Sequence, residues 1–169
     1  MFTQCEMIID YEKNEIHLHY INKKEKKTYQ HEMITSAKKV TSYPFELLDN
    51  RILVNANLSG RELKFVIDYG AESNILNSRL PDKVLDSVEV SGRILLNGTG
   101  TKKVEALSGT IQGLKLAGLE TDPLPVIVTD LQYTCFGNGK CINGVLGYDF
   151  LSRYKLCFNF AKRTLYIIE

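Results

Sequence analysis

The sequence has no long apolar run and no excess of charge of either sign. None of its hydrophobic stretches approaches the roughly 20 residues that a membrane-spanning helix needs. The formal net charge is +1, whereas proteins that bind nucleic acid through its phosphates carry clusters of Lys and Arg. We therefore expect neither a membrane span nor a nucleic-acid partner.

Cysteine is also sparse, with four in the chain. Cys135 and Cys141 bracket a Gly-rich turn, and this spacing favours a disulfide-closed loop over two free thiols. A zinc site would need two more ligands, and no His or second Cys pair lies close in sequence. Because disulfides persist in oxidising compartments, the loop indicates a periplasmic or secreted protein. Cys5 and Cys157 lie in apolar runs and are expected to be buried thiols.

The remaining composition is that of a globular domain. Of 169 residues, 44% are hydrophobic and 24% charged, which argues against disorder. This length suits one domain, or one domain with an appendage. No signal peptide follows Met1. Because we expect the chain to be part of a longer protein, that observation does not decide the compartment.

Short strands and turns are predicted along the whole chain. In the first 40 residues we expect strands at 7–11, 15–21 and 28–34, with a connector at 35–44. Later strands are predicted at 51–58, 62–67, 87–96, 102–116, 124–129, 155–160 and 164–168. Short helices are predicted at 78–85 and after Gly147, and Asp149 is the expected N-cap of the second helix. The strand at 124–129 is almost wholly apolar and is expected to be buried on both faces. His17 and His19 share a strand face, but no acidic or cysteine ligand completes a site, so we predict no metal and no cofactor.

The most informative stretch is the apolar strand that ends at Asp68. Residues 63–67 are mainly apolar, and Gly70 and Ala71 follow the aspartate. An ionised carboxylate is costly to bury without a partner. We therefore expect a tight turn that presents Asp68 at the rim of a hydrophobic core, with Gly70 in an unusual backbone conformation.

Two blocks in this order, 65–71 and 144–151, resemble one lobe of a retropepsin-like, pepsin-type aspartic protease. A Gly-tipped hairpin lies between them, and the resemblance covers about residues 45–169. It implies an all-β fold, mainly strands with one or two short helices, arranged as a closed-barrel-like lobe with a flap hairpin. Residues 1–40 would be N-terminal strands outside that lobe.

The resemblance also implies roles for individual residues. Asp68 would be the catalytic aspartate, presented by a turn formed by Tyr69, Gly70 and Ala71. The flap tip over the substrate would be Asn97, Gly98, Thr99, Gly100 and Thr101, and the apolar loop that supports the turn would be Gly144, Val145, Leu146 and Gly147.

The chemistry of this family needs two aspartates that face each other and share a proton. One carboxylate deprotonates a water while the other donates to the scissile carbonyl, so no cofactor is needed. The chain has one such turn. A second lobe of a longer chain, or a homodimer partner, would therefore supply the other aspartate, and the substrate would be a peptide or protein.

Tyr69 departs from the family pattern, which has Thr or Ser after the aspartate. That hydroxyl forms a hydrogen bond across the two-fold axis, and a phenol is too long to form it in the same place. Either Tyr69 points away, or the facing lobe differs to admit it.

The beginning of the chain resembles its end. Charged, apolar and turn positions of 6–18 match those of 155–167. This similarity predicts a C-terminal lobe that begins with the closing hairpin of a preceding lobe. The alternative is that both segments are amphipathic hairpins of common composition.

Three functions remain open from the sequence. The first is an aspartic endopeptidase lobe, active only when paired with a second aspartate. The second is a catalytically degenerate lobe that serves as a peptide-binding or structural module, as Tyr69 favours. The third, least favoured, is a plain β domain in which Asp68 only occupies a turn.

Overall fold

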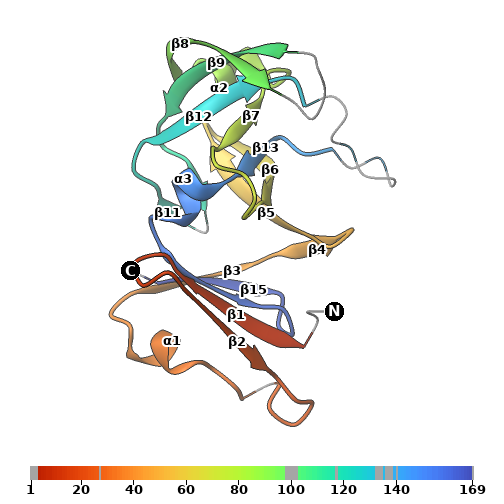
Figure 1. Cartoon of the computed structure of the whole chain (residues 1–169), viewed down its shortest axis with the longest axis vertical. Coiled ribbons are helices and arrows are strands. Elements are labelled where there is room, and N and C mark those ends of the chain that lie inside the picture. Colours follow the sequence, from red (N-terminus) through yellow and green to blue (C-terminus); the bar gives the residue numbers. More distant parts are fainter. Residues whose placement is uncertain are drawn as a thin grey trace. The chain divides into compact units, whose positions relative to one another are not determined.

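The computed structural model describes residues 4–26, 28–97, 103–116, 118–131, 135, 139 and 141–168. The chain divides into two compact units, Met1–Leu47 with Leu151–Glu169, and Leu48–Phe150. We call them the terminal unit and the central unit. Strands dominate both, and the described residues include three short helices (Figure 1). The all-β prediction is confirmed.

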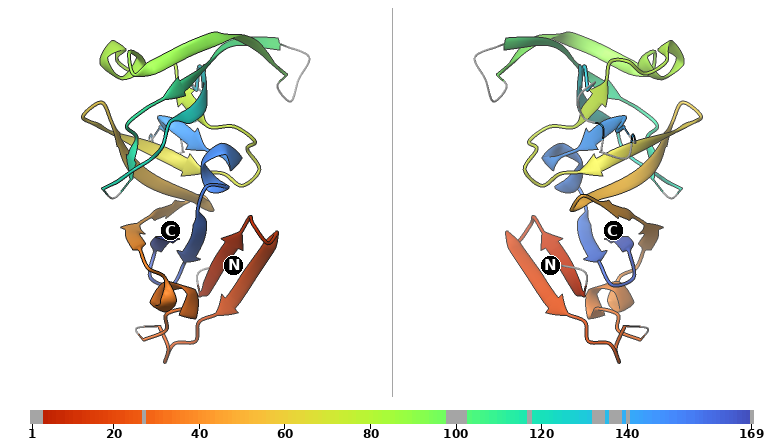
Figure 2. Two further views of the ribbon diagram at one scale, coloured as in Figure 1. Left: turned by 90° about the vertical axis from the view of Figure 1, so that its left-hand side faces the viewer. Right: turned by 90° about the vertical axis from the view of Figure 1, so that its right-hand side faces the viewer.

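The terminal unit is a five-stranded antiparallel sheet in the order β2-β1-β14-β15-β3. Its strands are β1 (Cys5–Asp10), β2 (Glu15–Tyr20), β3 (Val40–Pro44), β14 (Lys155–Asn159) and β15 (Thr164–Ile168). On one face Ile8 and Cys157 pack with Ile34 of helix α1 (Glu32–Ser36). Segments from the two ends of the sequence therefore share one sheet and one core (Figure 2).

The central unit contains a sheet in the order β11-β10-β5-β6-β13-β7-β12-β9-β8. Most neighbours are antiparallel, but β13 pairs parallel with β6, and β12 pairs parallel with β7. The elements are β5 (Arg51–Leu58), β6 (Arg61–Ile67), β7 (Ile75–Asn77), α2 (Asp82–Leu85), β8 (Val88–Asn97), β9 (Lys103–Ile111), β10 (Lys115–Leu116), β11 (Leu119–Glu120), β12 (Leu124–Thr129) and β13 (Gly144–Leu146). Short β4 (Glu46–Leu48) precedes them, and α3 (Tyr148–Leu151) follows.

Several turns form as their local chemistry predicts. Ser59 and Gly60 join β5 to β6 with φ angles of 54° and 80°. Two positive φ angles in a row are what a two-residue hairpin turn of type I′ requires, and Gly adopts such an angle without strain. This turn sets the register of the pair in which Ile52 lies opposite Ile67.

Four expectations were wrong. The strand predicted at 28–34 is irregular up to helix α1, which begins where the His31 Nδ1 atom accepts a hydrogen bond from the Met33 amide at 3.1 Å. The connector at 35–44 contains β3, whose strand conformation depends on pairing with β15. Strand β12 alternates between buried and more exposed residues, so it is not buried on both faces as expected. Asp149 lies inside α3 and is not its N-cap.

The expected closure into a barrel is also absent from the part of the chain that the structure describes. Its strands form two sheets, each with edge strands. The terminal sheet ends at β2 and β3, and the central sheet ends at β11 and β8.

A buried ion pair joins the two hairpins of the terminal sheet. The Asp10 side chain is 1% exposed, and its Oδ2 atom lies 2.8 Å from Lys155 Nζ. The hydrogen bond from Lys155 holds the pKa of the Asp10 carboxyl below its ordinary value, and the same bond raises the pKa of Lys155. The pair therefore stabilises the fold fully between the two ordinary pKa values. That contribution is lost as the pH falls through the lowered pKa of Asp10, or rises through the raised pKa of Lys155.

We expect Lys155→Met to lower the free energy of unfolding by about 3 kcal/mol at neutral pH, because it leaves Asp10 buried without a cation. The deficit should shrink near pH 3, about where a free carboxyl is protonated in any case. Urea denaturation at several pH values measures it.

The matched control is Lys115→Met. Lys115 pairs with Glu120 at 3.0 Å, but both side chains are at least half exposed. An exposed pair contributes up to about 1 kcal/mol. Equal losses in the two variants would contradict the role given to the buried pair.

Candidate active site

Asp68 directly follows β6, at the point where the strand leaves the core. Val66 and Ile67 are buried, whereas Asp68 is exposed. The apolar side chains of β6 hold the strand between β5 and β13, and the carboxyl group at its end is exposed to solvent. The predicted position at the rim of a core is therefore the one observed.

The turn after β6 folds back on the aspartate. The Gly70 amide donates to Asp68 Oδ1 at 2.8 Å, and the Ala71 amide donates to the Asp68 carbonyl at 3.3 Å. Gly70 is not among the glycines with positive φ, so the unusual backbone angle expected there was wrong. Close approach is the observed constraint, because a Cβ at Gly70 would lie 3.3 Å from Asp68 Oδ1.

Strand β13 supports the end of β6 from the side. The two run parallel, with Val145 opposite Val66 and Leu146 opposite Ile67, and the Asp68 amide donates to the Leu146 carbonyl at 3.1 Å. Gly144 lies so close to the Phe65 ring that a side chain could not fit there.

Gly147 lies against the turn itself. A Cβ at this position would lie 2.6 Å from the carbonyl oxygens of both Ala71 and Ser73. The next amide, of Tyr148, donates to the Ala71 carbonyl at 2.8 Å. The structure thus brings the two sequence blocks together through backbone contacts that only glycine permits.

Asn74 is a site residue that the sequence analysis missed. It is 1% exposed; its Oδ1 atom accepts from the Gly147 amide at 3.0 Å, and its Nδ2 atom donates to the Pro125 carbonyl at 3.0 Å. A buried amide with both ends paired locks the segments that it joins. In the sequence, Asn74 could be noticed as a polar residue directly before the apolar pair Ile75-Leu76.

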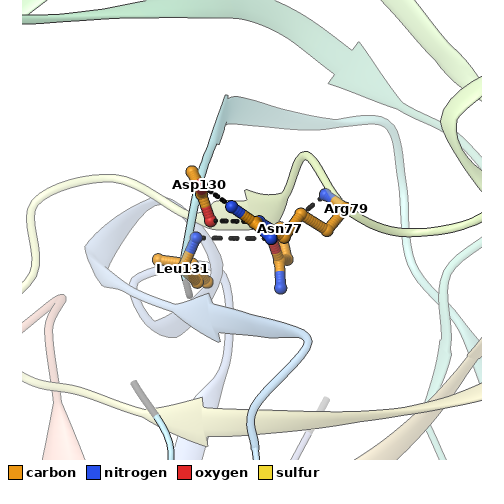
Figure 3. A network of polar contacts seen from close by, with 4 residues as sticks. All are labelled: Asn77, Arg79, Asp130 and Leu131. Carbon is orange, nitrogen blue, oxygen red and sulfur yellow. Dashed lines mark hydrogen bonds and ion pairs between the residues drawn. The ribbon is translucent and has the colours of Figure 1, made fainter. Parts of the chain in front are cut away.

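A second polar network ties the end of β7 to the segment after β12 (Figure 3). Arg79 makes two hydrogen bonds to the Asp130 carboxylate, at 2.9 and 2.8 Å. The Asn77 Oδ1 atom accepts from the amides of Arg79 at 3.1 Å and Leu131 at 3.3 Å. Leu131 packs in the cluster that contains Val66, so the network helps to hold the core beneath the aspartate turn.

Described residues of the central unit line cavities near the aspartate turn and near the β8–β9 hairpin. One of about 270 Å³ is lined by Asp68, Tyr69 and Gly70 together with Asn50, Arg51, Ile52, Val66 and Ile67. Tyr69, which follows the aspartate directly, is 39% exposed. The other, of about 280 Å³, is lined by part of the β8–β9 hairpin, by Ser78 and by residues 128–130.

The hairpin of β8 and β9 contains the strands on either side of the segment that the sequence analysis predicts to be a flap tip. The two strands pair from Val88 opposite Ile111 to Asn97 opposite Lys103. Gly98, Thr99, Gly100 and Thr101 lie outside the described residues.

Cys135 and Cys141 are bonded, as the spacing predicted, with 4.0 Å between their Cα atoms. This disulfide is compatible with an extracellular location. Cys157 is a buried thiol as expected, and burial raises its pKa, whereas Cys5 is only half-buried. In the described part of the chain, no helix is long and apolar enough to cross a membrane, and no three potential ligand side chains gather to hold a metal ion.

The chain has the fold of a known aspartic protease. It matches the crystal structure of a retropepsin-like aspartic protease from Rickettsia conorii with a TM-score of 0.50 and 22% identity, over 76% of this chain and 91% of that one. It also matches the retroviral protease-like domain of Ddi1 from Leishmania major with a TM-score of 0.44 and 22% identity, over 63% and 78% of the two chains. No curated protein matches the sequence.

The family assignment rests on the sequence match. The model of the aspartyl protease family matches residues 54–150, more than half of the chain. The match includes Asp68, its turn and the Gly144–Gly147 segment that supports it. This chain belongs to the aspartyl protease family, with a retropepsin-like fold.

Proposed function

We propose that the chain is one lobe of an aspartic endopeptidase that cleaves peptide bonds with water activated by Asp68 and a second aspartate from another lobe or subunit. The observation that carries the proposal is the exposed Asp68 carboxylate on a turn held by β13, Gly147 and Asn74. A positioned carboxyl group that is open to solvent is what a general base requires.

In this mechanism the two carboxyl groups share one proton, because two like charges at close range do not both ionise easily. (Aspartic proteases are a standard example of this effect.) The ionised carboxylate takes a proton from a water, whose oxygen attacks the scissile carbonyl carbon. The neutral one donates its proton to the carbonyl oxygen. The C–N bond then breaks as a proton passes to the leaving amine, so no covalent enzyme intermediate forms.

The backbone around Asp68 supplies the positioning. The Gly70 amide fixes one carboxylate oxygen at 2.8 Å, and the Leu146 carbonyl fixes the Asp68 amide. The cavity beside Asp68 is a candidate for one substrate side chain. Asn97, Gly98, Thr99, Gly100 and Thr101 are the proposed flap tip on the sequence resemblance alone. A preorganised turn of this kind needs no rearrangement as charge develops. The Cys135–Cys141 bond supports a secreted or periplasmic enzyme.

The second candidate is a degenerate lobe that binds peptides without cleaving them. Tyr69 favours it, because a partly exposed tyrosine follows Asp68 where the resembled family has Thr or Ser. If the natural protein and its Asp68 variant both bind a peptide and neither cleaves it, the function is peptide binding and not peptide hydrolysis.

Asp68→Asn in the natural full-length protein should lower kcat by about 10³-fold or more, because the amide cannot accept the proton from water. The assay is cleavage of a peptide library near pH 4, a rough value for a shared-proton pair. The control is Asp122→Asn, at an exposed aspartate outside the site. Equal cleavage by the natural protein and the Asp68 variant, or none by either, removes the catalytic role of Asp68.

Tyr69→Thr should raise kcat/KM by roughly 5- to 10-fold, the equivalent of one recovered hydrogen bond of about 1 kcal/mol to the facing lobe. Because Tyr69 is 39% exposed, little core packing is lost. Tyr69→Ala is the control, since it removes the phenol without adding a hydroxyl. If the Thr and Ala variants have the same kcat/KM, the hydroxyl has no such role.

A further inference from the structure

Two turns of the terminal sheet share a cavity of about 510 Å³. One is the turn after β2, which contains Lys23 and Lys26, and the other is the turn between β14 and β15, which ends at Arg163. These three basic residues line the cavity together, and none of the described residues that line it is acidic. A hollow whose charged groups are all cations concentrates positive potential and attracts anions.

Backbone hydrogen bonds at the start of β1 hold the two turns next to each other. The Ile21 amide donates to the Gln4 carbonyl at 2.7 Å. The Phe160 amide donates to the Cys5 carbonyl at 3.0 Å. Ile21 and Phe160 are 1% and 6% exposed, and both line the cavity. Because consecutive carbonyls of one segment bind both turns, the cavity is formed before any ligand arrives, which lowers the cost of binding.

The turn after β2 is also held by its own polar contacts. Asn22 Oδ1 accepts hydrogen bonds from the amides of Lys24 at 2.9 Å and Glu25 at 3.0 Å. Glu25 is the acidic residue of this turn, and its Oε2 atom accepts from the Asn22 amide at 3.4 Å. Glu25 does not line the cavity, whereas Lys23 and Lys26 do.

The three cavity cations lack the partners that other basic side chains have. Arg79, Lys115 and Lys155 each form an ion pair with a carboxylate. The basic side chains of the cavity form no ion pair with any residue that the structure describes. Since the net charge of the chain is only +1, this cluster of unpaired cations is a local feature of the cavity.

Arg163 has a backbone conformation that is unusual for its residue type. Its φ is 55°. The other described non-Gly residues with a positive φ are Asn14, Asp49, Asn50 and Ser59. Asn14 is the last residue of the four-residue connection between β1 and β2, and Arg163 has the same place between β14 and β15. Asparagine suits this conformation and arginine does not, so an arginine held here points to a role for its side chain.

We propose that this cavity binds a soluble anion that carries two adjacent phosphate groups. The planar guanidinium of Arg163 can donate two parallel hydrogen bonds to one phosphate, and Lys23 and Lys26 supply point charges for the other. Two linked phosphates carry about three negative charges at neutral pH, which three unpaired cations balance. A cavity of about 510 Å³ has the size of a small-molecule site and exceeds what a single phosphate fills.

The test is isothermal titration calorimetry of the natural full-length protein with inorganic pyrophosphate at low salt. Arg163→Asn should weaken binding by about 10-fold or more, the effect of one lost charge-assisted hydrogen bond. Asparagine favours the observed φ, so the urea midpoint of this variant should be no lower than that of the natural protein. Lost affinity in a protein of unchanged stability comes from the missing guanidinium and not from unfolding.

The double change Lys23→Gln and Lys26→Gln should also weaken pyrophosphate binding by about 10-fold or more. The matched control is Lys83→Gln, at an exposed lysine of α2 in the central unit, which should leave the affinity unchanged. The proposal is overturned if pyrophosphate does not bind, or if the natural protein, the Arg163 variant and the control bind it equally well.

Two further ligands separate this site from its alternatives. Orthophosphate should bind at least about 10-fold more weakly than pyrophosphate, because it cannot contact all three cations at once. Equal affinities would indicate a site for one phosphate and contradict the proposal. Vesicles of phosphatidylcholine and phosphatidic acid present the same chemistry on a lipid. Binding to the vesicles without binding to pyrophosphate would assign the cations to a membrane surface and overturn it.

This inference does not depend on the proposed function. The cavity lies within the terminal unit, whereas Asp68 belongs to the central unit. Asp68→Asn should therefore bind pyrophosphate as the natural protein does, whether or not either cleaves a peptide. A loss of pyrophosphate binding in that variant would place the anion at another site.

Discussion

The close backbone packing between β13 and the turn after β6 is the constraint on which the candidate site depends. Gly144 and Gly147 let two segments about 80 residues apart in sequence approach so closely that no side chain fits between them. Hydrogen bonds from the Asp68, Gly147 and Tyr148 amides then fix the turn. Asp68 itself needs no buried partner, because the backbone positions it and solvent hydrates it.

The terminal sheet follows a different rule, in which polar side chains specify a pairing inside an apolar sheet. Asp10 and Glu6 are both buried, and each has a partner on β14. A shift of the register would separate both pairs and leave charges buried alone, which is costly. The two contacts therefore specify one alignment of the hairpins, in which β2 and β3 are the edge strands among the described residues.

Expectations that rested on local chemistry were mostly right, and those that rested on long-range pairing were less so. The Ser59-Gly60 turn, the hairpin of β14 and β15 and the Cys135–Cys141 bond all follow from residues close in sequence. Strand β3 was expected as a connector, because an edge strand with half-exposed residues has little pattern of its own. A short apolar run before Ser36 suits a strand or a helix equally, and packing of Ile34 on Ile8 and Cys157 selected the helix.

The sequence by itself determined the family and the aspartate turn, because the residues that carry them are neighbours or lie in matched segments. Tertiary structure decided the remainder. The role of Asn74, the contact of Gly147 with the Ala71 carbonyl and the place of β2 at an edge of its described sheet depend on which distant backbones meet. The conformational preferences of neighbouring residues do not determine such long-range contacts, because burial and hydrogen bonding across the whole fold set them.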